Sequence, residues 1–339
     1  MPKVSQWITA SIAVFGLSFV LPAGGIKSKA GSAEITEQGP NELWRVPRDI
    51  ATRNLFYGPG GKAHAPQGTF TFVKEDLNGS NPKIDVTDRN GTKWKVKMGV
   101  EARPETVASR LVWAIGYFAT EDYFMSVLRV KEMPRLHRGR RYVTPDGLIY
   151  DVRLKRLPDG EKKVATWEWA DDPFTGTREL NGLRVLMAVI NNWDLKDENN
   201  AVVERSGARP EQIYLVSDLG ASFATTGFGW TRRGSKGNLQ AYERSQFLRE
   251  VTPDYVSFMA PSRPALDHYP DIHELKLRRS LYWIGRRIPR TDARWMGDLL
   301  GRLSRRQIED AFRAAQYSEE DVEAFSRVVE ERITVLRGL

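Results

Sequence analysis

The chain has 339 residues, enough to bury a large core as one large domain or as two lobes. With 41% hydrophobic and 28% charged residues it is not a disordered chain, and the absence of cysteine excludes a disulfide framework and thiol chemistry. The net charge of +8 suits an anionic partner, but nucleic acid is disfavoured because basic residues are mixed with acidic ones through most of the chain.

The first residues have the pattern of an export signal. Lys3 precedes an uncharged run at 7–21, and Pro22 and a small-residue tract ending at Ala33 follow it. This run of about 15 residues is short for a membrane-spanning helix, which needs roughly 20. We therefore predict that residues 1–33 are a signal peptide or an uncleaved anchor. The protein is expected to be exported, periplasmic or secreted, and to touch a membrane only through this segment if it is uncleaved.

The next part of the chain predicts a strand-rich lobe. Residues 34–68 show no regular pattern and are expected to form an irregular N-terminal segment. From 69 to 154, runs rich in β-branched and aromatic residues alternate with turn clusters, which is typical of strands. We assign this range to an N-lobe. The expected strands are 69–73, 83–88, 92–98, 123–130 and 148–154.

One helix is expected to interrupt these strands, at 100–118. Val107, Leu111 and Ile115 recur at the spacing of a single helical face. Pro104 suits a first helical turn, where its missing amide hydrogen costs nothing. The pattern therefore predicts a helix with one buried face, packed against the strands of the lobe.

From 155 to 339 the pattern becomes mainly helical. At 177–190 leucines, a methionine and an isoleucine recur at helical spacing, and further amphipathic stretches follow at 304–316 and 318–336. Ser318 with an acidic first turn behind it is a helix start signal. The predicted fold class is α+β, in two lobes: a strand-rich N-lobe with one main helix, and a helical C-lobe.

Polar residues gather directly after the helix predicted at 177–190. The stretch 191–203 reads NNWDLKDENNAVV, and a second strand at 213–216 ends in Ser217, Asp218, Leu219 and Gly220. A helix, a polar loop, a short strand, a turn and another strand follow in order. Read together, they would bring Asp194, Asn199 and Asp218 to one edge of a hairpin.

These residues resemble the protein-kinase-like superfamily. The catalytic loop H-R-D-L-x-x-x-N is similar to residues 192–199 here, and D-F-G is similar to 218–220. The resemblance implies Asp194 as the base that receives the acceptor proton, and Asn199 and Asp218 as ligands of Mg²⁺ or Mn²⁺. Lys196, two residues past the base, would reach the transferred phosphate.

The resemblance also implies nucleotide-binding residues in the N-lobe, where a strand lysine contacts the phosphates and a helix glutamate holds it. The preferred pair is Lys97 and Glu105, with Lys95 and Glu101 left open as alternatives. Gly79 and Ser80, in the hairpin turn LNGSNPK, would cover the phosphates. Because this turn has one glycine and lacks G-x-G-x-x-G, an ordinary hairpin turn is an equal interpretation.

Some positions depart from the protein-kinase pattern. Asn192 and Trp193 replace His-Arg, Leu219 replaces Phe, and the A-P-E signature is absent. The chain is therefore similar to atypical members, such as the lipid-kinase-like and secreted families. The expected function is to bind ATP and a divalent metal and to transfer a phosphoryl group to a hydroxyl acceptor. The alternative is a non-catalytic kinase-like binding or scaffold domain outside the cytoplasm.

Overall fold

The computed structural model describes residues 40–339 except 80, 193, 208–210, 225–235, 260–275 and 277–279. The predicted export segment therefore lies outside the described residues. Within them, no helix has the length and apolar character that crossing a membrane requires.

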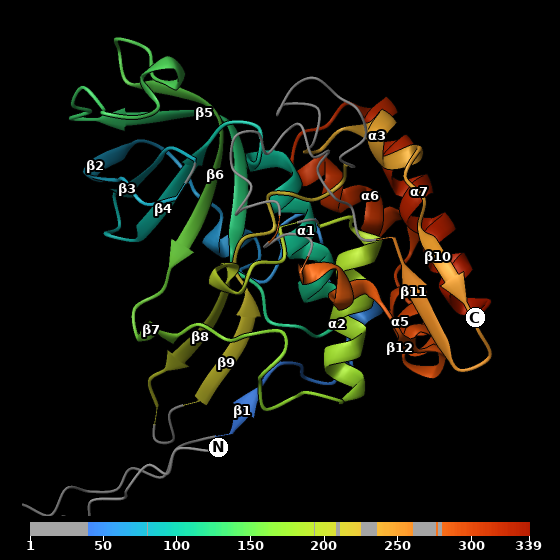
Figure 1. Ribbon diagram of the computed structural model, residues 1–339. Coiled ribbons are helices and arrows are strands. Elements are labelled where there is room, and N and C mark those ends of the chain that lie inside the picture. Colours follow the sequence, from blue (N-terminus) through green and yellow to red (C-terminus); the bar gives the residue numbers. More distant parts are fainter. Residues whose placement is uncertain are drawn as a thin grey trace, which may run out of the picture. The chain divides into compact units, whose positions relative to one another are not determined.

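Five strands close into a barrel in the N-terminal part (Figure 1), and all five strands predicted there are confirmed. Their order is β2-β3-β4-β6-β5, and β5 pairs in parallel with β2 to close the barrel. Alternate side chains such as Ile84, Trp94 and Leu154 fill its interior, as the period of two along a strand requires. The strands are β2 (Phe70–Asp76), β3 (Lys83–Thr87), β4 (Lys93–Met98), β5 (Asp122–Lys131) and β6 (Leu148–Leu157).

The helix α1 (Ala102–Ala114) follows β4 directly, as predicted. Pro104 lies in its first turn, and Val107 and Leu111 are buried. The helix is buried on almost all sides, because it packs against β5 and β6 of the barrel and also against α6 (Arg305–Ala314). The sequence predicted that only one face of this helix is buried. The structure shows that nearly all of its residues are buried, because the barrel covers one side and α6 covers another.

A second sheet holds the predicted polar loop and hairpin in place. Its order is β1-β9-β8-β7, and β1 pairs with β9 in parallel. Leu43, Ile50 and Leu55 are buried in the main core, so the segment at 40–68 is part of the fold although it has little regular structure. The strands are β1 (Asn41–Glu42), β7 (Glu161–Ala165), β8 (Asn200–Arg205) and β9 (Glu211–Val216).

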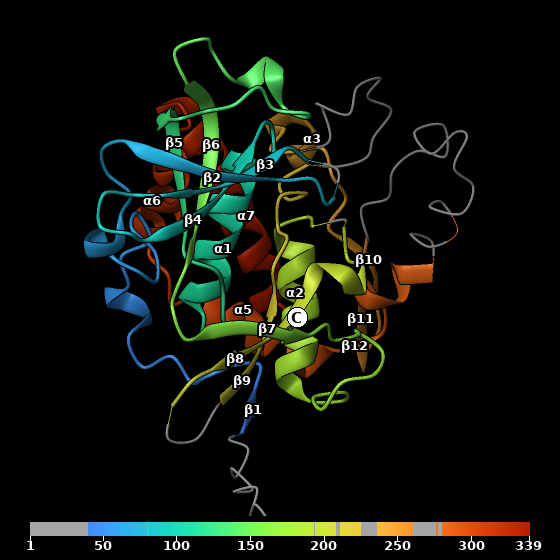
Figure 2. The same ribbon diagram turned by 90° about the vertical axis from the view of Figure 1, so that its left-hand side faces the viewer.

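Helices dominate the remainder of the chain (Figures 1 and 2), which confirms the α+β fold class. Ser304 and Gln307 form a capping box at the start of α6, and the Ser318 side chain caps α7. A small sheet accompanies the helices, made of β10 (Leu248–Val251), β11 (Tyr255–Phe258) and β12 (Ile288–Pro289). Besides α6, the α-helices among the described residues of this part are α2 (Arg178–Val189), α3 (Leu239–Glu243), α5 (Arg290–Leu300) and α7 (Glu319–Arg337).

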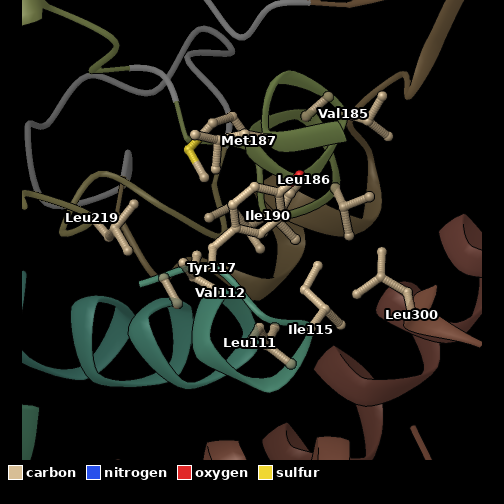
Figure 3. Packing of buried hydrophobic residues seen from close by; sticks show 14 of the residues in the cluster. Leu111, Val112, Ile115, Tyr117, Val185, Leu186, Met187, Ile190, Leu219 and Leu300 are labelled. Atoms are coloured by element: carbon tan, nitrogen blue, oxygen red, sulfur yellow. The ribbon is translucent and has the colours of Figure 1, made fainter. Parts of the chain in front are cut away.

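The core joins the helix of the N-lobe to the loop that carries Asp218. Figure 3 shows Leu111 of α1 in the same cluster as Leu186 of α2 and Leu219, which follows Asp218. Leu219 is 2% exposed. The side chain that replaces phenylalanine in the D-F-G pattern therefore anchors the turn by apolar burial, and Asp218 beside it is fixed relative to α1.

Candidate active site

Lys97 lies at the centre of the site, near the end of β4. The alternation along the strand turns it out of the barrel toward α1, where its side chain is 3% exposed. Its Nζ lies 3.1 Å from Glu101 Oε2, 2.8 Å from Glu105 Oε2 and 3.0 Å from Asp218 Oδ1. One ammonium therefore joins the strand, the helix and the Asp-Leu-Gly turn, which are far apart in the sequence.

The structure distinguishes between Lys95 and Lys97, and between Glu101 and Glu105, which the sequence left open. Lys95 binds two other carboxylates, Asp76 at 2.6 Å and Asp85 at 3.0 Å. Lys97, in contrast, contacts both Glu101 and Glu105. The lysine that meets the helix is thus Lys97, and its partners are both glutamates rather than one of them.

The charges at Lys97 stabilise one another. Burial alone would lower the pKa of Lys97, but Glu105 and Asp218 outweigh it and raise this pKa above its ordinary value. Burial alone would likewise raise the pKa of Asp218, yet the Lys97 ammonium holds it well below its ordinary value. Both groups are therefore charged at neutral pH.

Glu101, Glu105 and Asp218 also have the spacing of a metal site, since one oxygen of each lies within 4.8 Å of the others. The Nζ of Lys97, however, contacts all three carboxylates. Because the ammonium already supplies the compensating charge at their centre, these three residues do not form the cation site that the sequence predicts at Asn199 and Asp218.

The sequence did not predict Arg153 and Asp122, which form ion pairs next to Glu105. Arg153 of β6 is 4% exposed, and its Nη2 lies 2.8 Å from Glu105 Oε1. Its Nη1 lies 3.6 Å from Asp122 Oδ1. Burial raises the pKa of Glu105 even beside Arg153 and Lys97. The available signal was an arginine between the apolar residues Val152 and Leu154, but its partners depend on strand pairing.

Glu101 was named only as an alternative, yet it connects three further segments. It accepts a hydrogen bond from Asn81 Nδ2 at 2.6 Å, in the β2–β3 turn, and it pairs with Lys236, beyond the Asp-Leu-Gly turn. Gly220 lies against it so closely that an added Cβ would be 2.7 Å from Glu101 Cβ. This close approach explains the glycine of Asp-Leu-Gly, because any side chain there would displace Glu101.

The loop with Asp194 is tied to the strand that ends at Asp218. Asn199 Nδ2 donates to the Asp194 carbonyl at 2.8 Å, and Asp194 N donates to Asn192 Oδ1 at 3.0 Å. Ser217 donates from its amide and its hydroxyl to the Asn199 carbonyl, at 2.8 and 2.9 Å. Asn199 therefore fixes the backbone of the Asp194 loop, and Ser217 ties that loop to the strand end before Asp218.

The other predicted residues are Lys196, Gly79 and Ser80, and among the described residues neither Lys196 nor Gly79 forms an ion pair or side-chain hydrogen bond with Lys97 or its carboxylate partners. Lys196 Nζ lies 3.3 Å from Glu198 Oε1, and its side chain is 20% exposed. Gly79 lies in the β2–β3 turn with a φ of 71°, a left-handed conformation that favours glycine. Ser80 lies outside the described residues. The turn follows β2 directly and carries Asn81, which reaches Glu101.

A cavity of about 200 Å³ has Ser217, the residue before Asp218, in its lining. The end of β6, the β8–β9 hairpin and residues 118–121 line it, and Leu157, Ala201 and Leu215 supply apolar surface. Lys155 and Glu121 add charged groups to its lining. Arg156, Glu161, Lys163 and Arg205 also line it, so the cavity combines an apolar part with a strongly charged part.

The Lys95 pair predicts a pH dependence of stability. Burial would raise the pKa of Asp76, but the bonds from Lys95 and the Asn78 amide lower it from 3.8 to about 2. Because the folded pKa is depressed, the stabilisation is present in full above about pH 4 and is lost as the pH falls through about 2. It is worth about 2 kcal/mol. Urea unfolding at pH 7 and pH 3 should show a smaller loss on acidification for Asp76→Asn than for the unaltered protein, and equal losses would contradict this assignment.

The likenesses of this chain to known proteins are structural and distant. No protein-family model matches the chain, and none of the curated proteins matches its sequence. Among solved structures, it is similar to the Helicobacter pylori proinflammatory kinase CtkA, with a TM-score of 0.47, 12% identity, and coverage of 80% of this chain and 97% of that chain. The Golgi casein kinase gives a TM-score of 0.34 and 10% identity, covering 86% of this chain and 73% of that one.

The chain's own geometry has the order that the resemblance implied. The strand β4, which carries Lys97, leads into α1, which carries Glu105. The helix α2 leads into the loop with Asp194, and the β8–β9 hairpin then brings Asp218 into contact with Lys97. These connections and the contacts of Lys97 therefore agree with the two-lobed arrangement that the sequence resemblance implies.

Proposed function

We propose that the protein binds ATP with Mg²⁺ or Mn²⁺ and transfers a phosphoryl group to a hydroxyl acceptor outside the cytoplasm. The observation that carries the proposal is the contact of Lys97 with both Glu105 and Asp218, at 2.8 and 3.0 Å. These contacts set a phosphate-binding lysine beside a carboxylate suited to a metal, which is the pairing that phosphoryl transfer needs.

The donor atoms suit a hard cation. Asp218 Oδ1 accepts from Lys97 at 3.0 Å and from the Gly220 amide at 3.3 Å, while the side chain is 39% exposed, so Oδ2 is the oxygen left for a metal. Asn199 Oδ1 adds a neutral oxygen ligand. Such oxygen donors, together with phosphate oxygens, are the usual surroundings of Mg²⁺. A bound cation would neutralise the phosphate charge during transfer.

Asp194 and Lys196 would act on the acceptor. In the proposed step the hydroxyl oxygen of the acceptor forms a bond to the γ-phosphorus, and the bond from that phosphorus to the β–γ bridging oxygen breaks, releasing ADP. The hydroxyl proton passes to the Asp194 carboxylate. Lys196, on the same loop, would stabilise the negative charge of the transferred group.

The cavity beside Ser217 would hold the nucleobase. Its apolar wall at Ala201 and Leu157 suits a flat aromatic ring, and Ser217 in its lining would lead from the base toward Asp218. The phosphates would then extend to Lys97, on the side of the barrel where α1 packs.

The non-catalytic alternative has one observation in its favour. Asn192 replaces the histidine of the kinase loop, and its side chain is used to hold the Asp194 amide rather than to bind a substrate. Against it, Asp194, Asn199 and Asp218 are all present, and hydrogen bonds through Asn199 and Ser217 link the backbone of the Asp194 loop to the strand that ends before Asp218. A site without turnover would be expected to lose one of them.

The test is transfer of labelled γ-phosphate from ATP in the presence of Mg²⁺. The acceptors offered would be proteins with serine, threonine and tyrosine hydroxyls, sugars, and inositol lipids. Label that moves to one class supports a phosphotransferase and identifies its substrate class. Nucleotide binding without transfer to any class would favour the binding or scaffold function.

A further inference from the structure

Three cationic residues lie side by side on one face of the barrel. Strand pairing sets Lys83 of β3 opposite Lys97 of β4, and Lys97 opposite Arg153 of β6. Residues directly opposite on neighbouring strands share a face of the sheet, and like charges in this arrangement repel. Such a row is stable only when anions lie against it.

Two of the three cations have their anions within the protein. Lys97 contacts Glu101, Glu105 and Asp218, and Arg153 contacts Glu105 and Asp122. Both side chains are almost completely buried by these contacts.

Lys83 differs from its neighbours. Within the described part of the chain, no carboxylate oxygen lies within salt-bridge distance of its Nζ. Asp76 is opposite it on β2, but this carboxylate binds Lys95 at 2.6 Å and the Asn78 amide at 3.0 Å. Burial lowers the pKa of Lys83, which is half-buried, and Lys97 lowers it further, while Asp76 and Asp218 partly offset this.

The position of the Lys83 side chain indicates which kind of anion it could bind. Its Nζ lies 3.3 Å from the point where a Cβ on Gly79 would be, so the side chain reaches back under the β2–β3 turn. That turn stands where a glycine-rich loop would cover phosphates, yet it has a single glycine and contains Pro82, which has no amide hydrogen. The Lys83 ammonium thus lies at this turn, and Lys97 and Asp218 are near enough to affect its pKa.

The balance of charges around Lys97 also indicates that a bound phosphate needs a further cation. Three cations, Lys97, Arg153 and Lys236, face four carboxylates there. A triphosphate would therefore meet a site whose own cations are already matched by anions. A further cation is needed on the side of the turn, and Lys83 is placed there.

We propose that Lys83 is a second phosphate-binding lysine, which contacts the terminal phosphates of the nucleotide and replaces the amides of a glycine-rich loop. This inference rests on the proposed function. A lysine suits the role because its ammonium is a compact charge with three donors.

The test compares nucleotides that differ only in their phosphates. Calorimetric titration with ATP and with AMP, in Mg²⁺, would be carried out on the unaltered protein, Lys83→Met and Lys83→Arg. For Lys83→Met we expect the affinity for ATP to fall roughly tenfold to a hundredfold, with the affinity for AMP unchanged. Lys83→Arg should retain most of the ATP affinity. The control is Lys131→Met, an exposed lysine at the far end of β5, which should bind as the unaltered protein does.

The outcomes separate this inference from the proposed function. Equal ATP affinity for Lys83→Met and the unaltered protein would overturn the role of Lys83 and leave the function standing. An equal loss of ATP and AMP affinity would also overturn it, because it would indicate a distorted site rather than a lost phosphate contact. If the unaltered protein binds neither nucleotide, the proposed function fails, and this inference fails with it.

Discussion

Lys97→Met is expected to abolish ATP binding and to lower the free energy of unfolding by about 3–5 kcal/mol. The loss of stability follows from burial: Glu101, Glu105 and Asp218 would keep their positions but lose the ammonium that contacts all three. The loss of binding follows because the same ammonium is the proposed phosphate contact. Urea unfolding at pH 7 measures the first effect, and calorimetric titration with ATP measures the second.

The matched control is Lys131→Met, since Lys131 is also a strand lysine but is exposed. It should change neither stability nor binding. An unfolding curve for Lys97→Met that coincides with that of the unaltered protein would show that the buried charges are compensated by other groups. Retained ATP affinity would remove Lys97 from the nucleotide site.

Asp194→Asn is expected to reduce phosphoryl transfer by a factor of roughly 10² to 10⁴, with ATP affinity little changed. Asparagine keeps the size of the side chain but cannot receive the acceptor proton. The backbone of residue 194 would still accept from Asn199 and donate to Asn192, so the loop should keep its conformation. The labelled-phosphate assay and ATP titration, applied to the same preparation, separate the two quantities.

Glu198→Gln serves as the control for this variant, because Glu198 is a 70% exposed carboxylate in the same loop. Its transfer rate should stay near that of the unaltered protein. If Asp194→Asn transferred phosphate at the unaltered rate, Asp194 would not be the base. Loss of ATP affinity along with transfer would instead place Asp194 in nucleotide binding.

Local patterns were sufficient to locate most of the fold. The barrel strands alternate in hydrophobicity, and α1 follows β4 with a proline in its first turn, so their positions depend on neighbouring residues. Lys97 was found for the same reason, being the last lysine of an alternating strand that leads directly into a helix.

Partners that depend on strand pairing could not be predicted from the sequence. Arg153 meets Glu105 only because β6 lies beside β4 in one particular register, and Lys83 lies opposite Lys97 for the same reason. The burial of α1 on almost all sides also depends on α6, about 200 residues further along the chain. Likewise, the contact of Glu101 with Lys236 required knowing where the chain returns after Asp218.

Thermal unfolding of the protein with nucleotide and Mg²⁺ tests most directly whether the site around Lys97 and Asp218 binds a nucleotide together with a metal. A ligand present at about 100 times its Kd stabilises the folded state by roughly 2.7 kcal/mol, which for a chain of this size raises the Tm by several degrees. We expect such a rise with ATP and Mg²⁺, and a clearly smaller one when a chelator removes the metal. An unchanged melting curve with every nucleotide tested would contradict it.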